Sequence, residues 1–153
     1  MDRLETDEDI DRGIKFLCRR EPAFERATAR INASIPLRRR AGGFDALLEA
    51  IVSQQLSVAS AAAIWARAEA AGLTEAQRIL STSDAALREV GLSRQKIKYV
   101  RALALADLDF NALAAASTRE VVEVLTQISG IGVWTAEIYA MFSLGHQDVF
   151  PSG

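Results

Sequence analysis

The residues Gly130-Ile131-Gly132 could bind an anion without any basic side chain. They separate two segments in which apolar residues recur at helical spacing. Glycine adopts positive φ readily and lets another backbone approach closely. The helix that follows would begin with N–H groups that have no acceptor, and these groups attract a phosphate. The pattern predicts either a phosphate-binding hairpin or a simple turn between two helices.

Four other side chains invite a chemical interpretation. Gln54 and Gln55 end an apolar helical pattern, where they could contact a nucleotide or simply be solvated. His146 has no Cys or His partner nearby in the sequence, which argues against a metal site. Cys18 lies among apolar residues and is predicted to be a core residue. Because it is the only cysteine and cannot form an internal disulfide, the chain is expected to come from a reducing compartment.

The elements that must position these residues are predicted to be helices. Apolar residues recur three or four positions apart, as at Ile10, Ile14 and Leu17, and no segment alternates as a strand would. The pairs Thr74–Gln77 and Ser117–Glu120 fit capping boxes. Serines at 57, 83 and 93 are further candidate caps. The sequence therefore predicts an all-α fold of about eight or nine short helices.

Composition limits the function classes. The chain has 153 residues, 50% of them hydrophobic, which is enough for one folded domain and excludes a disordered tail. A net charge of −2 provides no overall basic field, so nucleic acid would have to bind through a local patch or backbone dipoles. The run Arg38-Arg39-Arg40 is either a solvated surface or a phosphate contact. No apolar run is long enough to span a membrane, and the acidic N-terminus resembles no targeting signal.

Four segments in the same order resemble the helix-hairpin-helix DNA glycosylase superfamily, in particular the AlkA-type 3-methyladenine DNA glycosylases. In chain order they are Ile51-Val52-Ser53-Gln54-Gln55-Leu56-Ser57, Gly91-Leu92-Ser93-Arg94-Gln95-Lys96, Gly130-Ile131-Gly132-Val133-Trp134-Thr135-Ala136 and Asp148-Val149-Phe150-Pro151. The resemblance implies a compact multi-helix glycosylase core over 44–153, with the hairpin at 125–144. Residues 1–43 would be N-terminal helices that pack on a C-terminal lobe.

The resemblance also implies how DNA is held. The hairpin residues Gly130, Ile131, Gly132, Val133, Trp134 and Thr135 would bind the backbone, with N–H groups of 130, 132 and 134 on a phosphate near the lesion. Gln54 and Gln55 would fill the gap left by a flipped nucleotide. Main-chain oxygens of Thr126, Ile128 and Ile131 would hold a sodium or potassium ion; no other cofactor is expected.

A base pocket and a reaction type follow from the same resemblance. The pocket would use the rings of Trp134, Tyr139 and Phe44 to favour cationic alkylated purines such as 3-methyladenine. Relatives with lyase activity have a lysine where this chain has Trp134, and an indole cannot form a Schiff base. The expected protein is therefore a monofunctional base excision repair enzyme, a hydrolase of the DNA-3-methyladenine glycosylase II type.

The family's catalytic aspartate would follow Gly153, so none of the 153 residues is assigned as catalytic. Asp148 precedes the motif and is no substitute, and no other carboxylate is expected beside the pocket. The chain thus resembles a truncated glycosylase, which is expected to bind lesion DNA weakly and not to excise.

The expected partner is double-stranded DNA with alkylated bases, bound by a monomer in the bacterial cytoplasm and without a membrane. Two alternatives remain open at this point. One is a non-catalytic helix-hairpin-helix DNA-binding module. The other is a helical interaction domain in which the glycines only make a turn.

Overall fold

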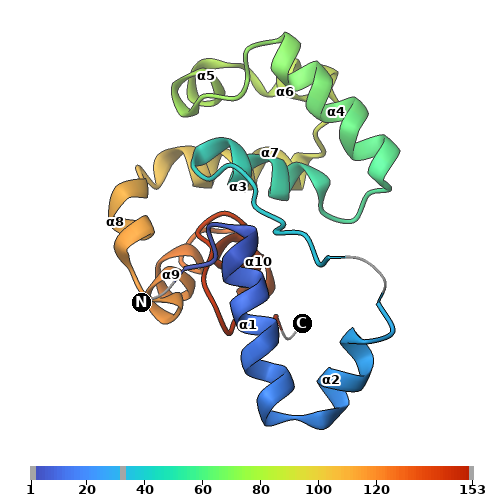
Figure 1. The fold of residues 1–153 in the computed structure, drawn as a ribbon. Coiled ribbons are helices and arrows are strands. Elements are labelled where there is room, and N and C mark those ends of the chain that lie inside the picture. Colours follow the sequence, from blue (N-terminus) through green and yellow to red (C-terminus); the bar gives the residue numbers. More distant parts are fainter. Residues whose placement is uncertain (1–2, 32–33, 152–153) are drawn as a thin grey trace.

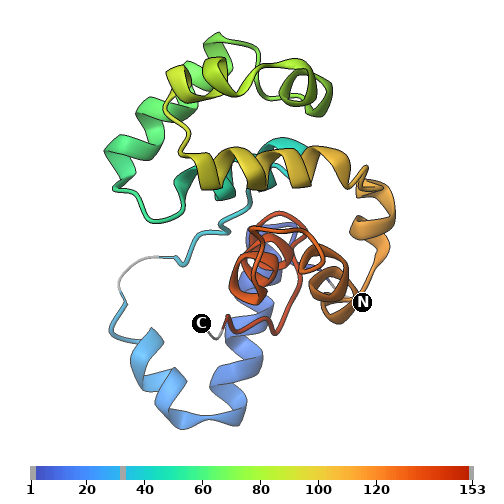
Figure 2. The same ribbon diagram turned by 180° about the vertical axis from the view of Figure 1, so that it is seen from behind.

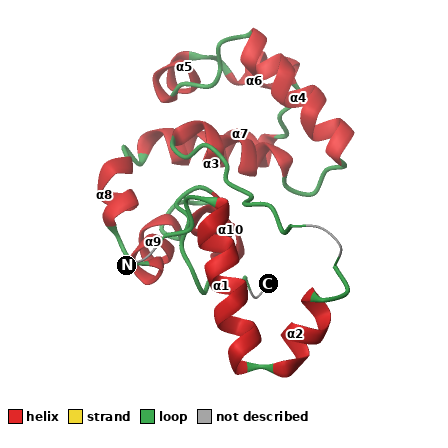
Figure 3. Ribbon diagram, in the orientation of Figure 1, coloured by secondary structure: helices red, strands yellow, loops and turns green. Residues whose placement is uncertain are grey.

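The structure, a computed structural model, describes residues 3–31 and 34–151 and is all-α, as predicted. Within those ranges it has ten helices and no strand, only an isolated bridge between Arg3 and His146 (Figure 1; Figure 3). The helices are α1 (Asp7–Arg20), α2 (Pro22–Thr28), α3 (Phe44–Ser53), α4 (Val58–Ala70), α5 (Ala76–Ser81), α6 (Asp84–Val90), α7 (Arg94–Leu105), α8 (Phe110–Ala115), α9 (Thr118–Leu125) and α10 (Val133–Phe142).

Side-chain caps begin most of these helices. Ser57, Ser83 and Ser93 each accept a backbone N–H in the first turn of α4, α6 and α7. The capping box of Ser117 and Glu120 is confirmed at α9. These serines were recognisable because each immediately precedes an apolar helical repeat.

Two local predictions are wrong. No capping box forms at Thr74, because α5 begins one residue later, after Glu75, which makes no side-chain cap bond. The short helix α8 was not predicted; it is capped by Asp109, whose carboxylate accepts the N–H groups of Asn111 and Ala112. A six-residue helix has too few apolar positions to show a clear period.

The core lies around α3 and α7, which cross the middle of the molecule. Helices α4, α5 and α6 cover one side of this pair, and α9 and α10 lie on the other (Figure 1; Figure 2). The side chains of Leu47, Ile51, Val100, Leu103 and Leu125 are almost completely buried between these layers. One apolar core therefore holds the segment 125–144 against α3.

Helices α1 and α2 stand apart from this core. Neither helix has a buried residue, and Phe16, Leu17 and Phe24 remain exposed. The segment before α1 ties the pair to the core: the N–H of Leu4 donates to the Gly145 carbonyl over 2.8 Å. Cys18 is only half-buried, with its sulfur 3.4 Å from the Thr28 hydroxyl, so its prediction as a core residue is wrong.

Candidate nucleic-acid interface and base pocket

The predicted hairpin joins α9 to α10 through residues 126–132. Ile128 and Ile131 are buried, and the N–H of Ile131 donates to the Ile128 carbonyl over 3.0 Å. These two side chains fix the turn on the core, while Gly132 is exposed. The sequence pattern of apolar residues around glycine is therefore a packed turn, not a loose loop.

The two glycines of the turn differ in what they do. Gly130 has φ +99°, and a Cβ placed on it would lie 2.3 Å from Cγ of Tyr99. Gly132 has φ −92°, and a Cβ there would meet no atom within 4 Å. Gly130 is thus required by the fold, whereas the fold would accept a side chain at Gly132.

The N-terminus of α10 is open. Gly132 is the N-cap and has no side chain to accept a hydrogen bond. The N–H groups in the first turn of α10 therefore have no acceptor among the described residues. Val133 and Trp134 are 49% and 53% exposed. An exposed indole therefore lies beside the uncapped N–H groups.

The two glutamines predicted to act together have different surroundings. Nε2 of Gln54 donates to the Gly130 carbonyl over 2.8 Å, which joins the end of α3 to the hairpin. Gln55 is exposed, and its φ of +56° lies in the left-handed region, which is uncommon outside glycine. Gln54 therefore braces the hairpin, while Gln55 projects from a strained position.

A cavity of about 610 Å³ lies between α3 and α10. Trp134, Ile138 and Tyr139 line it from α10, and Gln54 and Gln55 line it at the end of α3. Its volume is in the range that small-molecule sites occupy. The structure thus brings most of the predicted base-pocket residues to one cavity.

Tyr139 lines the cavity as predicted, whereas Phe44 does not. Tyr139 is 5% exposed, and its hydroxyl accepts the Gly43 N–H over 2.9 Å, so it braces the wall at its edge. Burial raises the pKa of this phenol. Phe44 does not line the cavity; it packs against the core and faces a second hollow beside Leu103 and Phe110.

Sequence reasoning missed two acidic residues. Asp45 and Glu49 line the same cavity from one face of α3, so the expectation of no carboxylate beside the pocket is wrong. Arg40 lines it too, with its guanidinium 5.4 Å from the centre of the Phe142 ring. The i, i+4 spacing of the two acids was the available signal.

Several basic residues are engaged within the fold. Nζ of Lys96 donates to the Val52 carbonyl at the end of α3, and desolvation lowers the pKa of this lysine. Arg101 binds Asp84 and the carbonyl of Thr82 over 2.7 Å each. Arg38 is exposed, as a solvated or phosphate-binding residue would be.

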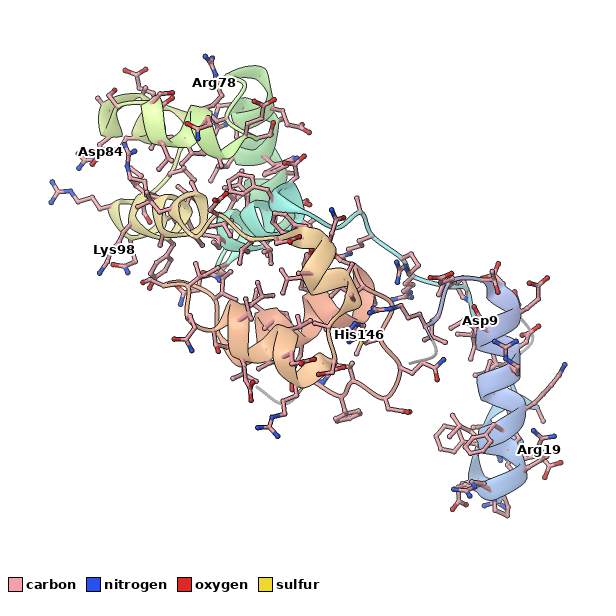
Figure 4. All side chains as sticks on the ribbon, turned by 90° about the vertical axis from the view of Figure 1, so that its left-hand side faces the viewer. Asp9, Arg19, Arg78, Asp84, Lys98 and His146 are labelled. Carbon is pink, nitrogen blue, oxygen red and sulfur yellow. The ribbon has the colours of Figure 1, made fainter. Side chains whose placement is uncertain are left out.

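His146 is buried, with Nδ1 2.8 Å from the Thr118 hydroxyl and Nε2 without a partner in the described ranges. Burial, with Arg3 and Arg39 nearby, lowers its pKa. Figure 4 shows it inside the helical body, far from Arg19 on the α1–α2 pair. Residues 3–31 and 34–151 contain no group of three or more metal-binding side chains.

Comparison with known families decides what this hairpin belongs to. Residues 48–135, which span α3 through the first turn of α10, match the family described as HhH-GPD superfamily base excision DNA repair protein. The chain belongs to the HhH-GPD superfamily. Its match ends within the hairpin whose glycines, buried isoleucines and open helix terminus are described above.

Members of the superfamily with similar sequences are DNA glycosylases. The chain is 31% identical over 118 residues to DNA-3-methyladenine glycosylase 1 of Schizosaccharomyces pombe, covering 71% of this chain and 52% of that protein. It is 40% identical to the structure of a DNA-3-methyladenine glycosidase from Bacillus halodurans, with a TM-score of 0.72, covering 78% of this chain and 58% of the other.

One similar structure contains DNA. The S. pombe 3-methyladenine DNA glycosylase Mag1, in complex with abasic DNA, is 29% identical with a TM-score of 0.68, covering 84% of this chain and 68% of that one. The chain spans about half the length of the curated relatives it matches. No helix in the described part of the chain is long and apolar enough to cross a membrane.

Proposed function

We propose that this chain is the lesion-binding part of a monofunctional DNA glycosylase for alkylated purines. The observation that carries the proposal is the uncapped N-terminus of α10 beside a cavity that contains the exposed Trp134. Backbone N–H groups of Gly130, Gly132 and Trp134 bind a DNA phosphate, and the adjoining cavity receives the flipped base. The printed names of the relatives support this substrate class.

Gln54 and Gln55 have different roles in holding the opened duplex. Gln55 is exposed at the mouth of the cavity and fills the space that a flipped nucleotide leaves. Gln54 stays on the Gly130 carbonyl and keeps the hairpin and α3 in register. The strained backbone of Gln55 supports a functional role, because such strain clusters at ligand sites.

The reaction proposed is hydrolysis of the bond between base and sugar, without strand cleavage. Trp134 offers an aromatic face to a cationic base and has no amine to attack the sugar. The cation proposed at the hairpin would be held by the carbonyls of Thr126, Ile128 and Ile131. The Ile128 carbonyl also accepts the Ile131 N–H, and a carbonyl oxygen retains a second lone pair. A bound cation would add positive charge beside the phosphate site.

Methylated duplex DNA tests the reaction type. The protein expressed from its complete reading frame should release free methylated purines and leave intact strands with abasic sites. Borohydride should trap no protein–DNA adduct; a trapped adduct would contradict the monofunctional mechanism. The 153-residue chain assayed beside it should bind the DNA without excising, since the resemblance assigns no catalytic residue within it. Binding without excision by both proteins would instead favour the non-catalytic binding module.

A further inference from the structure

The acidic wall of the cavity makes no bond within the described fold, although Asp45 lies in the first turn of α3, where a negative charge also favours the helix. Asp45 and Glu49 both line the cavity from α3, both are exposed, and neither takes part in an ion pair or hydrogen bond within the described residues. Carboxylates next to a DNA surface repel phosphates and weaken binding to any sequence. Arg40, the basic residue of the lining, stacks over Phe142 and offsets only one of the two charges.

An independent feature of the cavity favours a polar ligand. Thr135 lines the cavity and is 9% exposed, yet its hydroxyl has no hydrogen-bond partner in the described structure. By contrast, the hydroxyl of Thr126 at the end of α9 is bonded within the fold: it donates to the Val122 carbonyl over 2.7 Å. Because the Thr135 hydroxyl has no partner within the described fold, it is free to bond a polar group of a ligand in the cavity.

We propose that Asp45 and Glu49 select positively charged bases over neutral ones, with the Thr135 hydroxyl bonding the edge of the bound base. This inference rests on the proposed function and assigns its charge specificity to three residues. Trp134 would attract a cation through its ring face, which any large planar base could also occupy. The two carboxylates distinguish charge itself, because a neutral base of the same shape gains nothing from them.

The test compares equilibrium binding to three duplexes that differ at one central nucleotide. One carries 2′-fluorinated 7-methyldeoxyguanosine, whose base is cationic and resists release, and the second carries 2′-fluorinated deoxyguanosine. The third carries a tetrahydrofuran abasic analogue. The wild-type chain should prefer the methylated duplex to the unmethylated one. Asp45→Asn/Glu49→Gln should reduce that preference roughly three- to tenfold, as expected for loss of nearby charge.

Glu89→Gln is the matched control, because Glu89 is an exposed carboxylate on α6 outside the cavity. It changes the net charge by one and should leave the preference unchanged. Thr135→Val should weaken binding of both base-containing duplexes and spare the abasic one. An unchanged preference in Asp45→Asn/Glu49→Gln, with wild-type affinity for abasic DNA, would overturn this inference alone. Failure of the wild-type chain to bind any of the three duplexes would overturn the proposed function as well.

Discussion

The molecule contains two helical hairpins that follow the same local rules and end differently. In the first, α1 and α2 meet at Glu21-Pro22: the proline has no N–H, and the Glu21 carboxylate accepts the Ala23 N–H over 3.0 Å. In the second, α9 and α10 meet at a turn that ends on Gly132, which provides no side-chain acceptor. The N-terminus of α2 is therefore capped by a side chain of the same hairpin, whereas the N-terminus of α10 has no side-chain cap.

Burial separates the two hairpins as well. The α1–α2 pair buries no side chain, although its apolar residues have helical spacing. In contrast, Val121 and Leu125 of α9 and Ala136 of α10 are completely buried. A site for a ligand needs both properties of the second hairpin: a rigid attachment to the core and a terminus that nothing in the chain occupies.

The largest expected effect is on the packed hairpin. Gly130→Ala should lower the free energy of unfolding by about 3 kcal/mol or more, because the new Cβ overlaps Tyr99 and Gly130 has positive φ. Urea denaturation measures it. Gly13→Ala in α1 is the control: its Cβ would meet nothing within 4 Å, and alanine should stabilise the helix by up to ~1 kcal/mol. Equal losses in both variants would remove the distinction between the hairpins.

Acid should destabilise the second hairpin through His146. Because burial and two arginines lower the pKa of His146 below the ordinary 6.5, the unfolded chain binds the proton more readily than the folded one. Stability contributed by neutral His146 is fully present above about pH 6.5 and decreases as pH falls below it. Denaturation across pH 5 to 7 should show this slope, and His146→Gln should flatten it. A slope that persists in the variant would assign it to another group.

A smaller effect distinguishes the two glutamines. Gln54→Ala should cost about 1 kcal/mol of stability, since the bond to the Gly130 carbonyl is lost. Gln55→Ala should leave stability close to wild type and weaken binding to abasic DNA. Thermal unfolding and a binding titration measure the pair. Equal stability losses would show that Gln55 is also part of the packing.

The smallest effect is expected at the closed terminus. Glu21→Ala removes a cap from α2 and should cost about 0.5–1 kcal/mol at most. DNA affinity should not change, because Pro22 still denies the terminus an N–H group. Weaker DNA binding in this variant would show that the first hairpin also contacts the duplex.

Local rules were enough to predict the helices and the hairpin from the sequence, whereas the family was indicated by the resemblance of four segments. Serine caps, helical spacing and the two glycines act over a few residues, so they are visible without coordinates. The prediction of Thr74 as a cap was wrong because α5 starts one residue later, after Glu75. The local pattern does not distinguish a helix start after Thr74 from one after Glu75.

Tertiary arrangement set the limits of prediction in the site. Phe44 and Asp45 are neighbours in sequence, yet Asp45 lines the cavity and Phe44 does not. Which face of α3 meets α10 depends on packing across the core, which no local pattern contains. For the same reason the sequence assigned Gln54 and Gln55 the same role, although only Gln54 donates to the Gly130 carbonyl.

The most direct test is the affinity of Gly132→Val for a duplex that carries an abasic analogue. A Cβ at this position meets no atom of the described fold within 4 Å, so unfolding should stay near wild type while the valine side chain blocks the approach of a phosphate to the α10 amides. We expect affinity to fall at least about tenfold on damaged and undamaged duplexes alike, with a salt slope lower by about 0.9 for one lost phosphate contact. Wild-type affinity in a stably folded Gly132→Val variant would contradict the assignment of the hairpin as the DNA-binding site.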